Sequence, residues 1–195
     1  MSIRVVGIAG SLREGSFNKG LLRAAVEVAP AEMEISTFNR LGDIPPYNDD
    51  VMSKGDPEPV AAFKAAIREA EAMLIATPEY NYGIPGVLKN AIDWASRPSG
   101  NCVLNRKPAA LMGCSQGLGG TIRAQHALRQ SFVFTETYVM LQPEIKIPSV
   151  AKMFDASGRL TDENTRQHIQ KFLVSFVGWI ARFKSRSRDK DGAHL

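Results

Sequence analysis

The sequence alternates short apolar segments with segments whose apolar residues follow helical spacing. The first segment, residues 3–9, is a continuous apolar run, which is typical of a strand buried on both faces of a parallel sheet. Residues 17–29 follow with apolar side chains three and four positions apart, which indicates a helix. A sheet of such strands is buried on both faces only if helices cover both sides. The alternation therefore predicts an α/β fold with right-handed crossovers.

The same alternation continues along the chain and predicts five strands. They cover residues 3–9, 32–38, 73–77, 109–114 and 134–141, and residues 144–147 would extend the sheet. Helices are predicted over residues 17–29, 60–70, 85–94, 121–131 and from residue 161 onward, with a long polar loop over residues 39–59. This pattern matches a flavodoxin-like, doubly wound three-layer sandwich with a five-stranded parallel sheet of order 2-1-3-4-5.

Length and composition favour one domain with a complete core. The chain has 195 residues, of which 44% are hydrophobic, so we expect a single domain over residues 1–185 and a basic, disordered tail over residues 186–195. Residues 182–191 carry five basic and two acidic side chains, so three of the four net positive charges lie at this end. A basic end with few aromatic residues is typical of a solvated segment and does not indicate nucleic-acid binding.

The first residues and the cysteines bear on the cellular compartment. Residues 1–5 enter an apolar run without the pattern of a signal peptide, and no apolar stretch approaches the roughly 18 residues of a membrane span. We therefore expect a cytoplasmic protein that does not associate with membranes. In that reducing compartment Cys102 and Cys114 are expected to remain free thiols.

The loop after the first predicted strand, residues 10–18, has groups suited to bind phosphate. It leads into a predicted helix, whose free N–H groups and dipole favour an anion. Ser11, Ser16 and Asn18 can donate hydrogen bonds, and Arg13 supplies positive charge. The loop lacks the lysine of a P-loop and the glycine pattern of a dinucleotide fingerprint, so neither of those sites is indicated. The alternative is a surface turn in which Ser16 only caps the helix.

The loop after the third predicted strand is suited to a planar polar ring. Its sequence is Pro78-Glu79-Tyr80-Asn81-Tyr82-Gly83. Its two tyrosines would form a wall against an aromatic ring, with backbone N–H groups near Asn81 at the edge of that ring. In the predicted sheet this loop faces the first one across the switch point. Together the loops predict a mononucleotide, and the lack of a metal-ligand pattern in the sequence favours a flavin. A plain surface turn is the alternative.

The loop after the fourth predicted strand supports a competing interpretation. The sequence Gly113-Cys114-Ser115-Gln116-Gly117 matches the G-x-S-x-G elbow of serine hydrolases. Such an enzyme needs an acid and then a histidine later in the chain, but His168 falls within a predicted helix and His194 is the penultimate residue. His126 also lies in a predicted helix. A hydrolase is therefore the less favoured alternative, and this loop is predicted to contact the flavin.

Three segments together resemble a known family. Gly10-Ser11-Leu12-Arg13 with Ser16 and Asn18, Pro78-Glu79-Tyr80-Asn81, and residues 85–94 resemble the NADPH-dependent FMN reductase family of flavodoxin-like quinone, azo-dye and chromate reductases. The resemblance implies FMN as the cofactor and a homodimer or homotetramer with FMN near subunit boundaries. The residues implied are Ser11, Arg13, Ser16, Phe17 and Asn18 for the phosphate, Pro78, Glu79, Tyr80, Asn81 and Tyr82 for the isoalloxazine, and Ser115 and Gly117 beside them.

The resemblance also implies an activity. NADPH or NADH would pass a hydride through FMN to quinones and to oxidised metal anions such as chromate, without a side-chain nucleophile or a metal. Arg97, at the end of a predicted helix, is a candidate contact for an anionic acceptor. A flavodoxin-type electron carrier would share the fold and the cofactor. Such carriers are usually strongly acidic, whereas this chain has a net charge of +4, which favours the enzyme.

Overall fold

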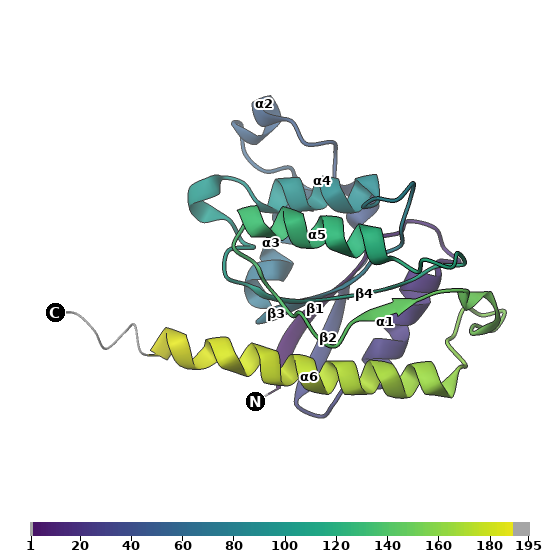
Figure 1. The fold of residues 1–195 in the computed structure, drawn as a ribbon. Coiled ribbons are helices and arrows are strands. Elements are labelled where there is room, and N and C mark those ends of the chain that lie inside the picture. Colours follow the sequence, from purple (N-terminus) through teal and green to yellow (C-terminus); the bar gives the residue numbers. More distant parts are fainter. Residues whose placement is uncertain (1, 189–195) are drawn as a thin grey trace.

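The computed structural model describes residues 2–188, with side chains described through residue 183. Strands and helices alternate along this part of the chain (Figure 1). The strands are β1 (Ile3–Ala9), β2 (Met33–Phe38), β3 (Ala72–Ala76), β4 (Pro108–Cys114), β5 (Tyr138–Val139) and β6 (Ile145–Ile147). The helices are α1 (Phe17–Glu27), α2 (Asp49–Met52), α3 (Glu58–Glu69), α4 (Gly86–Ala95), α5 (Ile122–Phe134) and α6 (Glu163–Arg188).

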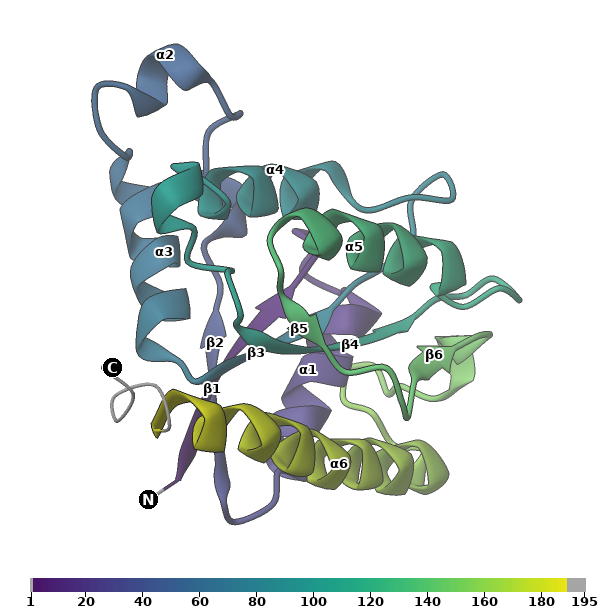
Figure 2. The same cartoon turned by 60° about the vertical axis from the view of Figure 1, so that its left-hand side comes forward.

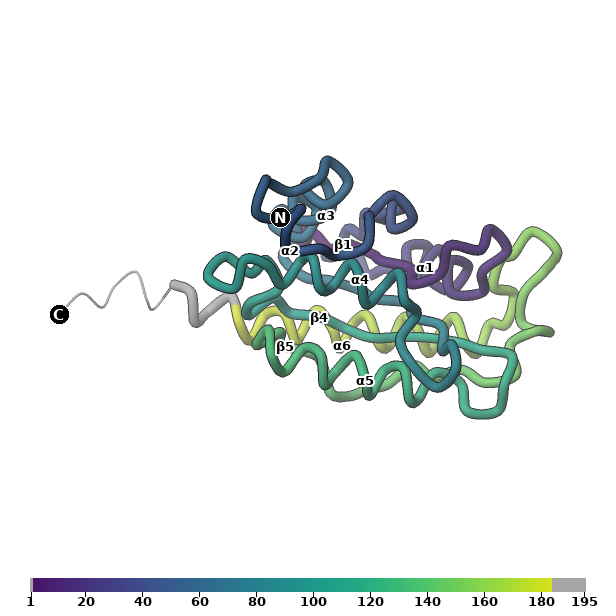
Figure 3. Tube along the Cα trace, turned by 90° about the horizontal axis from the view of Figure 1, so that it is seen from above, coloured from purple at the N-terminus to yellow at the C-terminus, as the bar shows by residue number. Residues whose placement is uncertain are grey.

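The described strands form one parallel sheet between two layers of helices. The sheet has the predicted order, β2-β1-β3-β4-β5, and β6 also pairs with β4. Helices α3, α4 and α5 cover one face, with α4 between the other two, and α1 and α6 cover the opposite face (Figure 2 and Figure 3). Because neighbouring residues of a strand point to opposite faces, Val5 and Leu74 pack with α1 and α6, whereas Val6 and Ile75 pack with α3 and α4. The predicted three-layer sandwich is confirmed.

The edge of the sheet beyond β4 differs from the prediction, which placed one strand over residues 134–141. Two short strands share this edge: β5 pairs with Pro108 and Ala109, and β6 pairs with residues 112–114. Helix α5 continues to Phe134, which is 71% exposed and so is not needed in the core. Pro143, between the two strands, has no N–H to donate to a ladder, and this interrupts the pairing.

The helix bounds follow the predictions within three residues, and two segments depart from them. The long loop predicted over residues 39–59 contains the short helix α2. Helix α6 continues to Arg188, past the domain boundary predicted at residue 185. The remainder of the predicted tail, residues 189–195, lies outside the described residues. Pro85 stands directly before α4, where its missing N–H costs no helical hydrogen bond.

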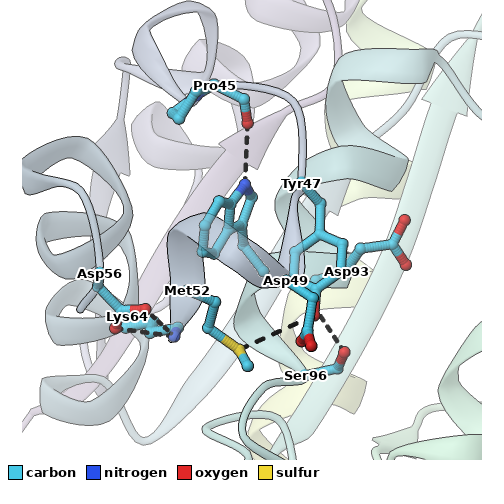
Figure 4. Close-up of polar contacts among 9 residues, drawn as sticks. Pro45, Tyr47, Asp49, Met52, Asp56, Lys64, Asp93 and Ser96 are labelled. Carbon is cyan, nitrogen blue, oxygen red and sulfur yellow. Dashed lines mark hydrogen bonds and ion pairs between the residues drawn. The ribbon is translucent and has the colours of Figure 1, made fainter. Parts of the chain in front are cut away.

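The loop that carries α2 is fixed to the body of the protein by partly buried hydrogen bonds to α4. Asn90 of α4 accepts the Tyr47 N–H at 2.7 Å and donates to the Pro45 carbonyl at 2.9 Å. Figure 4 shows Pro45 and Tyr47 on this loop together with the ion pair of Lys64 with Asp56. The base of the loop is therefore ordered, while α2 itself projects away from the sheet (Figure 1).

The carboxyl ends of β1, β3 and β4 lie side by side at one edge of the sheet. The register pairs Ala9 with Ala76, and Ala76 with Met112. The loops after these strands, residues 10–16, 77–85 and 115–121, therefore start next to one another. Ligands of open α/β sheets bind outside this edge.

Candidate functional site

The predicted phosphate loop lies at the N-terminus of α1. Ser16 caps this helix: its Oγ accepts the Lys19 N–H at 3.4 Å, and its own N–H donates to the Arg13 carbonyl at 3.2 Å. Ser11 is buried, and its Oγ lies 3.1 Å from the hydroxyl oxygen of Tyr80 on the second loop. Hydroxyl groups, a guanidinium and the start of a helix thus surround a pocket of about 180 Å³. The capping role of Ser16 and a role in anion binding are compatible.

Asn18 joins the phosphate loop to the third loop. Its Nδ2 donates to the Cys114 carbonyl at 2.9 Å, and its Oδ1 accepts the Cys114 N–H at 3.0 Å. The side chain is buried, so both hydrogen bonds are shielded from water. Phe17 packs against Phe154 with ring centroids 5.1 Å apart, and the Arg13 guanidinium lies 5.5 Å from the Phe17 centroid. These contacts set the position of the first turn of α1.

The second loop forms a closed turn at the end of β3. The Tyr80 N–H donates to the Gly83 carbonyl at 3.1 Å, and the Gly83 N–H donates back to the Tyr80 carbonyl at 2.9 Å. Asn81 and Tyr82, between them, have positive φ angles of 49° and 63°, which are uncommon for residues other than glycine. Tyr80 and Tyr82 are 50% and 72% exposed. The turn therefore presents two aromatic side chains and an amide at the edge of the sheet.

The third loop is held by backbone hydrogen bonds to the end of β6 and to the segment that follows it. The Ser115 N–H donates to the Ile147 carbonyl at 2.9 Å, and the Val150 N–H donates to the Ser115 carbonyl at 3.2 Å. The Ser115 hydroxyl donates to the Gly117 carbonyl at 3.2 Å, within its own loop. Burial raises the pKa of the neighbouring Cys114 thiol to about 12, so this thiol stays protonated at neutral pH and is not a nucleophile there.

The arrangement around Ser115 is not that of a serine hydrolase. A triad requires an imidazole within hydrogen-bond distance of the serine. His126 is exposed on α5, and His168 is exposed on α6, which covers the other face of the sheet (Figure 2). His194 lies outside the described residues. The serine hydroxyl contacts its own loop instead.

The second and third loops border a wider cleft, which adjoins the phosphate pocket. The cleft has a volume of about 610 Å³, and Glu79, Ser115 and Gln116 line both cavities. A Cβ atom added at Gly117 would meet only Ser115 Oγ, at 3.7 Å, so the backbone is accessible at this point of the wall. An anion pocket that opens into a cleft with tyrosine and glycine walls fits FMN, since its phosphate and its ring need these two environments.

The structure brings all twelve residues predicted to bind FMN to these two cavities. Ser11, Arg13, Ser16, Phe17, Asn18, Pro78, Glu79, Tyr80 and Ser115 line the smaller pocket, and Asn81, Tyr82 and Gly117 line the cleft. Their contact with FMN itself stays a prediction. Sequence reasoning missed Gln116, which lies inside the elbow motif, and Arg123. Arg123 is a basic residue in the first turn of the helix after the third loop, and this position is the signal that could have identified it from the sequence.

Arg97 does not join the site within one copy of the chain. It lies beyond the C-terminal end of α4, and the N-terminal end of that helix is the one next to the second loop. Its guanidinium lies 5.9 Å from the ring centroid of Phe134, at the end of α5. The two ends of a crossover helix lie at opposite edges of a sheet, so within one chain Arg97 lines neither cavity, and its contact with an acceptor stays a prediction. The cation at the cleft is Arg123.

A parallel sheet of order 2-1-3-4-5 with a pocket at the carboxyl ends of its first, third and fourth strands is typical of the flavodoxin-like class of mononucleotide-binding proteins. Within this class, the profile of the family described as NADPH-dependent FMN reductase matches residues 3–152. The chain belongs to this family and is an oxidoreductase with FMN as its cofactor. Membership of this family excludes the serine hydrolase, and it favours a flavin-dependent reductase over a flavodoxin-type electron carrier.

Relatives named as FMN reductase or quinone reductase match almost the whole chain. The chain is 47% identical over 182 residues to the NAD(P)H-dependent FMN reductase of Pseudomonas aeruginosa, covering 93% of this chain and 97% of that protein. It is 40% identical over 184 residues to the quinone reductase of Escherichia coli, again covering 93% and 97%. The structure of the flavoenzyme NAD(P)H:(acceptor) oxidoreductase of Paracoccus denitrificans superposes with a TM-score of 0.84 at 39% identity, covering 92% of this chain and 98% of that one.

Three further properties concern only the part of the chain that the structure describes. No helix there is long and apolar enough to span a membrane. No group of three or more His, Cys, Asp or Glu side chains is arranged there to hold a metal ion. Cys102 and Cys114 are both free thiols, as predicted.

Proposed function

We propose that this chain is an NAD(P)H-dependent quinone reductase that holds FMN in the two adjoining cavities. The observation that carries the proposal is the junction of a small anion pocket with a wider aromatic cleft. When held there, FMN would supply the redox chemistry that links NAD(P)H oxidation to quinone reduction. Relatives named 2-hydroxy-1,4-benzoquinone reductase and quinone reductase support quinones as the class of acceptor.

The residues of the chain would bind and orient the cofactor. Ser11, Arg13 and Ser16 would hold the phosphate at the N-terminus of α1, where the helix dipole favours an anion. The closed turn after β3 would present the backbone and side chains of Asn81 and Tyr82 to the ring. The third loop would complete the wall between phosphate and ring, because Ser115 lines both cavities.

The purified protein provides the test. We expect a yellow protein whose flavin absorbance bleaches under anaerobic NADPH or NADH and returns when 1,4-benzoquinone is added. The cofactor released by heat should be FMN. Steady-state rates with both substrates varied should give parallel double-reciprocal lines, because the oxidised nucleotide leaves before the quinone reacts. A protein that binds FMN but is bleached by neither nucleotide would contradict the proposal.

Chromate is a further acceptor that we propose. Arg123 at the cleft is half exposed, and the chain carries a net charge of +4. Positive potential near a site raises the rate at which anions reach it. These observations support an oxidised metal anion as an acceptor alongside quinones.

Assembly into a homodimer or homotetramer is also proposed. Large apolar side chains are exposed at the cleft, where Leu118 is 91% exposed, and at the end of α5, where Val133 is 76% exposed. Large apolar side chains exposed in this way lose contact with water when another protein surface packs against them. A second copy of the chain would cover them through closed symmetry, the commonest arrangement of soluble oligomers.

A further inference from the structure

Glu79 stands at the junction of the two cavities, but its carboxylate is turned toward α5. Its Oε2 accepts the backbone N–H groups of Arg123 at 2.8 Å and Ala124 at 3.1 Å. Its Oε1 accepts Nη1 of Arg123 at 3.1 Å. The side chain is only 9% exposed. A carboxylate at a helix N-terminus is stabilised by the free N–H groups and the dipole, so this contact ties the second loop to α5.

The same contact fixes the side chain of Arg123. The guanidinium carbon lies 3.9 Å from the ring centroid of Tyr82, close enough for a cation–π interaction. The guanidinium is thus held between the Glu79 carboxylate and the Tyr82 ring. Arg123 and Tyr82 both line the cleft of about 610 Å³. A half-exposed arginine without such partners would spread over several rotamers in water.

We propose that Glu79 is a positioning residue, which holds the Arg123 guanidinium at the cleft where the FMN ring would lie. Through Arg123 it would set the electrostatic surroundings of the ring, although its own oxygens are used by α5. A cation kept at a fixed place in a partly dry site interacts more strongly with a nearby charge than one that moves in water. The inference rests on the proposed placement of FMN in this cleft.

The test is a double-mutant cycle on the midpoint potential of bound FMN. The four proteins are the wild type, Arg123→Met, Glu79→Gln and the double variant. In the wild-type background Arg123→Met should lower the potential, because the loss of a cation disfavours the more negative, reduced cofactor. In the Glu79→Gln background the same substitution should produce a shift no more than about half as large, because the guanidinium has already lost its fixed place.

FMN affinity supplies a second readout on the same four proteins. Each single variant should weaken FMN binding to the apoprotein by about tenfold, while the second substitution should add a factor of only about two, because the two groups act as one unit. Glu27→Gln is the matched control: Glu27 of α1 pairs with Arg166 of α6 at 2.8 Å, and these helices cover the face of the sheet opposite α5 (Figure 2), so this variant should change neither readout. If Glu79→Gln does not fold, Glu79→Asp replaces it, since the shorter side chain withdraws the carboxylate from the guanidinium.

The outcomes distinguish this inference from the proposed function. Equal shifts of potential in both backgrounds, or strictly multiplicative losses of affinity, would overturn the positioning role while leaving an FMN enzyme in place. Loss of apoprotein stability with unchanged potential and affinity would mean that Glu79 only caps α5. A wild-type protein that binds no FMN would refute the proposed function and the inference with it.

Discussion

Arg13 is the cation of the smaller pocket, and its guanidinium rests near the ring of Phe17. A hydrogen bond to a charged group contributes roughly 1.5 to 3 kcal/mol, so Arg13→Ala should weaken FMN binding by about ten- to a hundredfold. A fluorescence titration of the apoprotein measures this change. Arg23→Ala is the control of equal charge, because Arg23 donates to the Gly158 carbonyl and lines neither cavity. Equal affinities for all three proteins would remove Arg13 from the phosphate site.

Also at the residue scale, the sequence indicated which ligand groups the twelve predicted residues suit, but it did not indicate which residues contact one another. The residue types of the phosphate loop and of the tyrosine loop indicate their ligands directly, because hydroxyl groups, a guanidinium and phenol rings have distinct binding chemistry. The pairing of Asn18 with the backbone of Cys114 could not be predicted. It depends on where β4 ends relative to α1, which no local pattern contains.

At the scale of elements, α3 contains a lysine that is almost fully buried. Lys64 is 1% exposed, and its Nζ lies 2.6 and 2.8 Å from the two carboxylate oxygens of Asp56, which is 28% exposed (Figure 4). Asp56→Ala leaves a buried charge without its partner and should cost about 3 kcal/mol of unfolding free energy. Lys64→Met removes the buried charge with little change of volume and should cost less than about 1 kcal/mol. Urea unfolding of both variants checks the difference, and equal losses would contradict it.

The helices and strands were predictable to different degrees. The buried runs of β1 and β3 and the amphipathic pattern of α1 are strong signals, because hydrophobic spacing follows the geometry of each element. The fifth strand was misplaced because residues 132–134 are apolar whether they end a helix or begin a strand. Exposure of Val133 and Phe134 on α5 shows that hydrophobicity at these positions does not report burial in this chain.

At the scale of the whole molecule, the positive net charge of the protein should affect the rate of chromate reduction more than the rate of quinone reduction. With pre-reduced enzyme, the rate constant for chromate should fall as salt rises, because the Debye length shortens from about 30 Å at 0.01 M to about 10 Å at 0.1 M. The rate constant for uncharged benzoquinone should change less than about twofold over the same range. Stopped-flow reoxidation measures both without interference from the charge of NAD(P)H. A chromate rate that does not respond to salt would argue against electrostatic attraction at Arg123.

Assembly is the second prediction at this scale. Light scattering should give two or four times the chain mass of 21.3 kDa across a series of protein concentrations, because a second copy would cover the exposed apolar side chains. The mass and the quinone reductase activity should be measured on the same sample. A fully active protein with the mass of one chain would refute the proposed assembly.

The sequence by itself determined the α/β class, the order of the sheet and the three loops that line the two cavities. These features follow from local properties: hydrophobic period, turn residues and the chemistry of single side chains. Only the tertiary structure decided that Arg123 and not Arg97 lines the cleft, and that Glu79, 44 residues away in the sequence, contacts its guanidinium. Such pairings depend on how helices dock across the sheet, which is set by the packing of the whole core and is not encoded in any short segment.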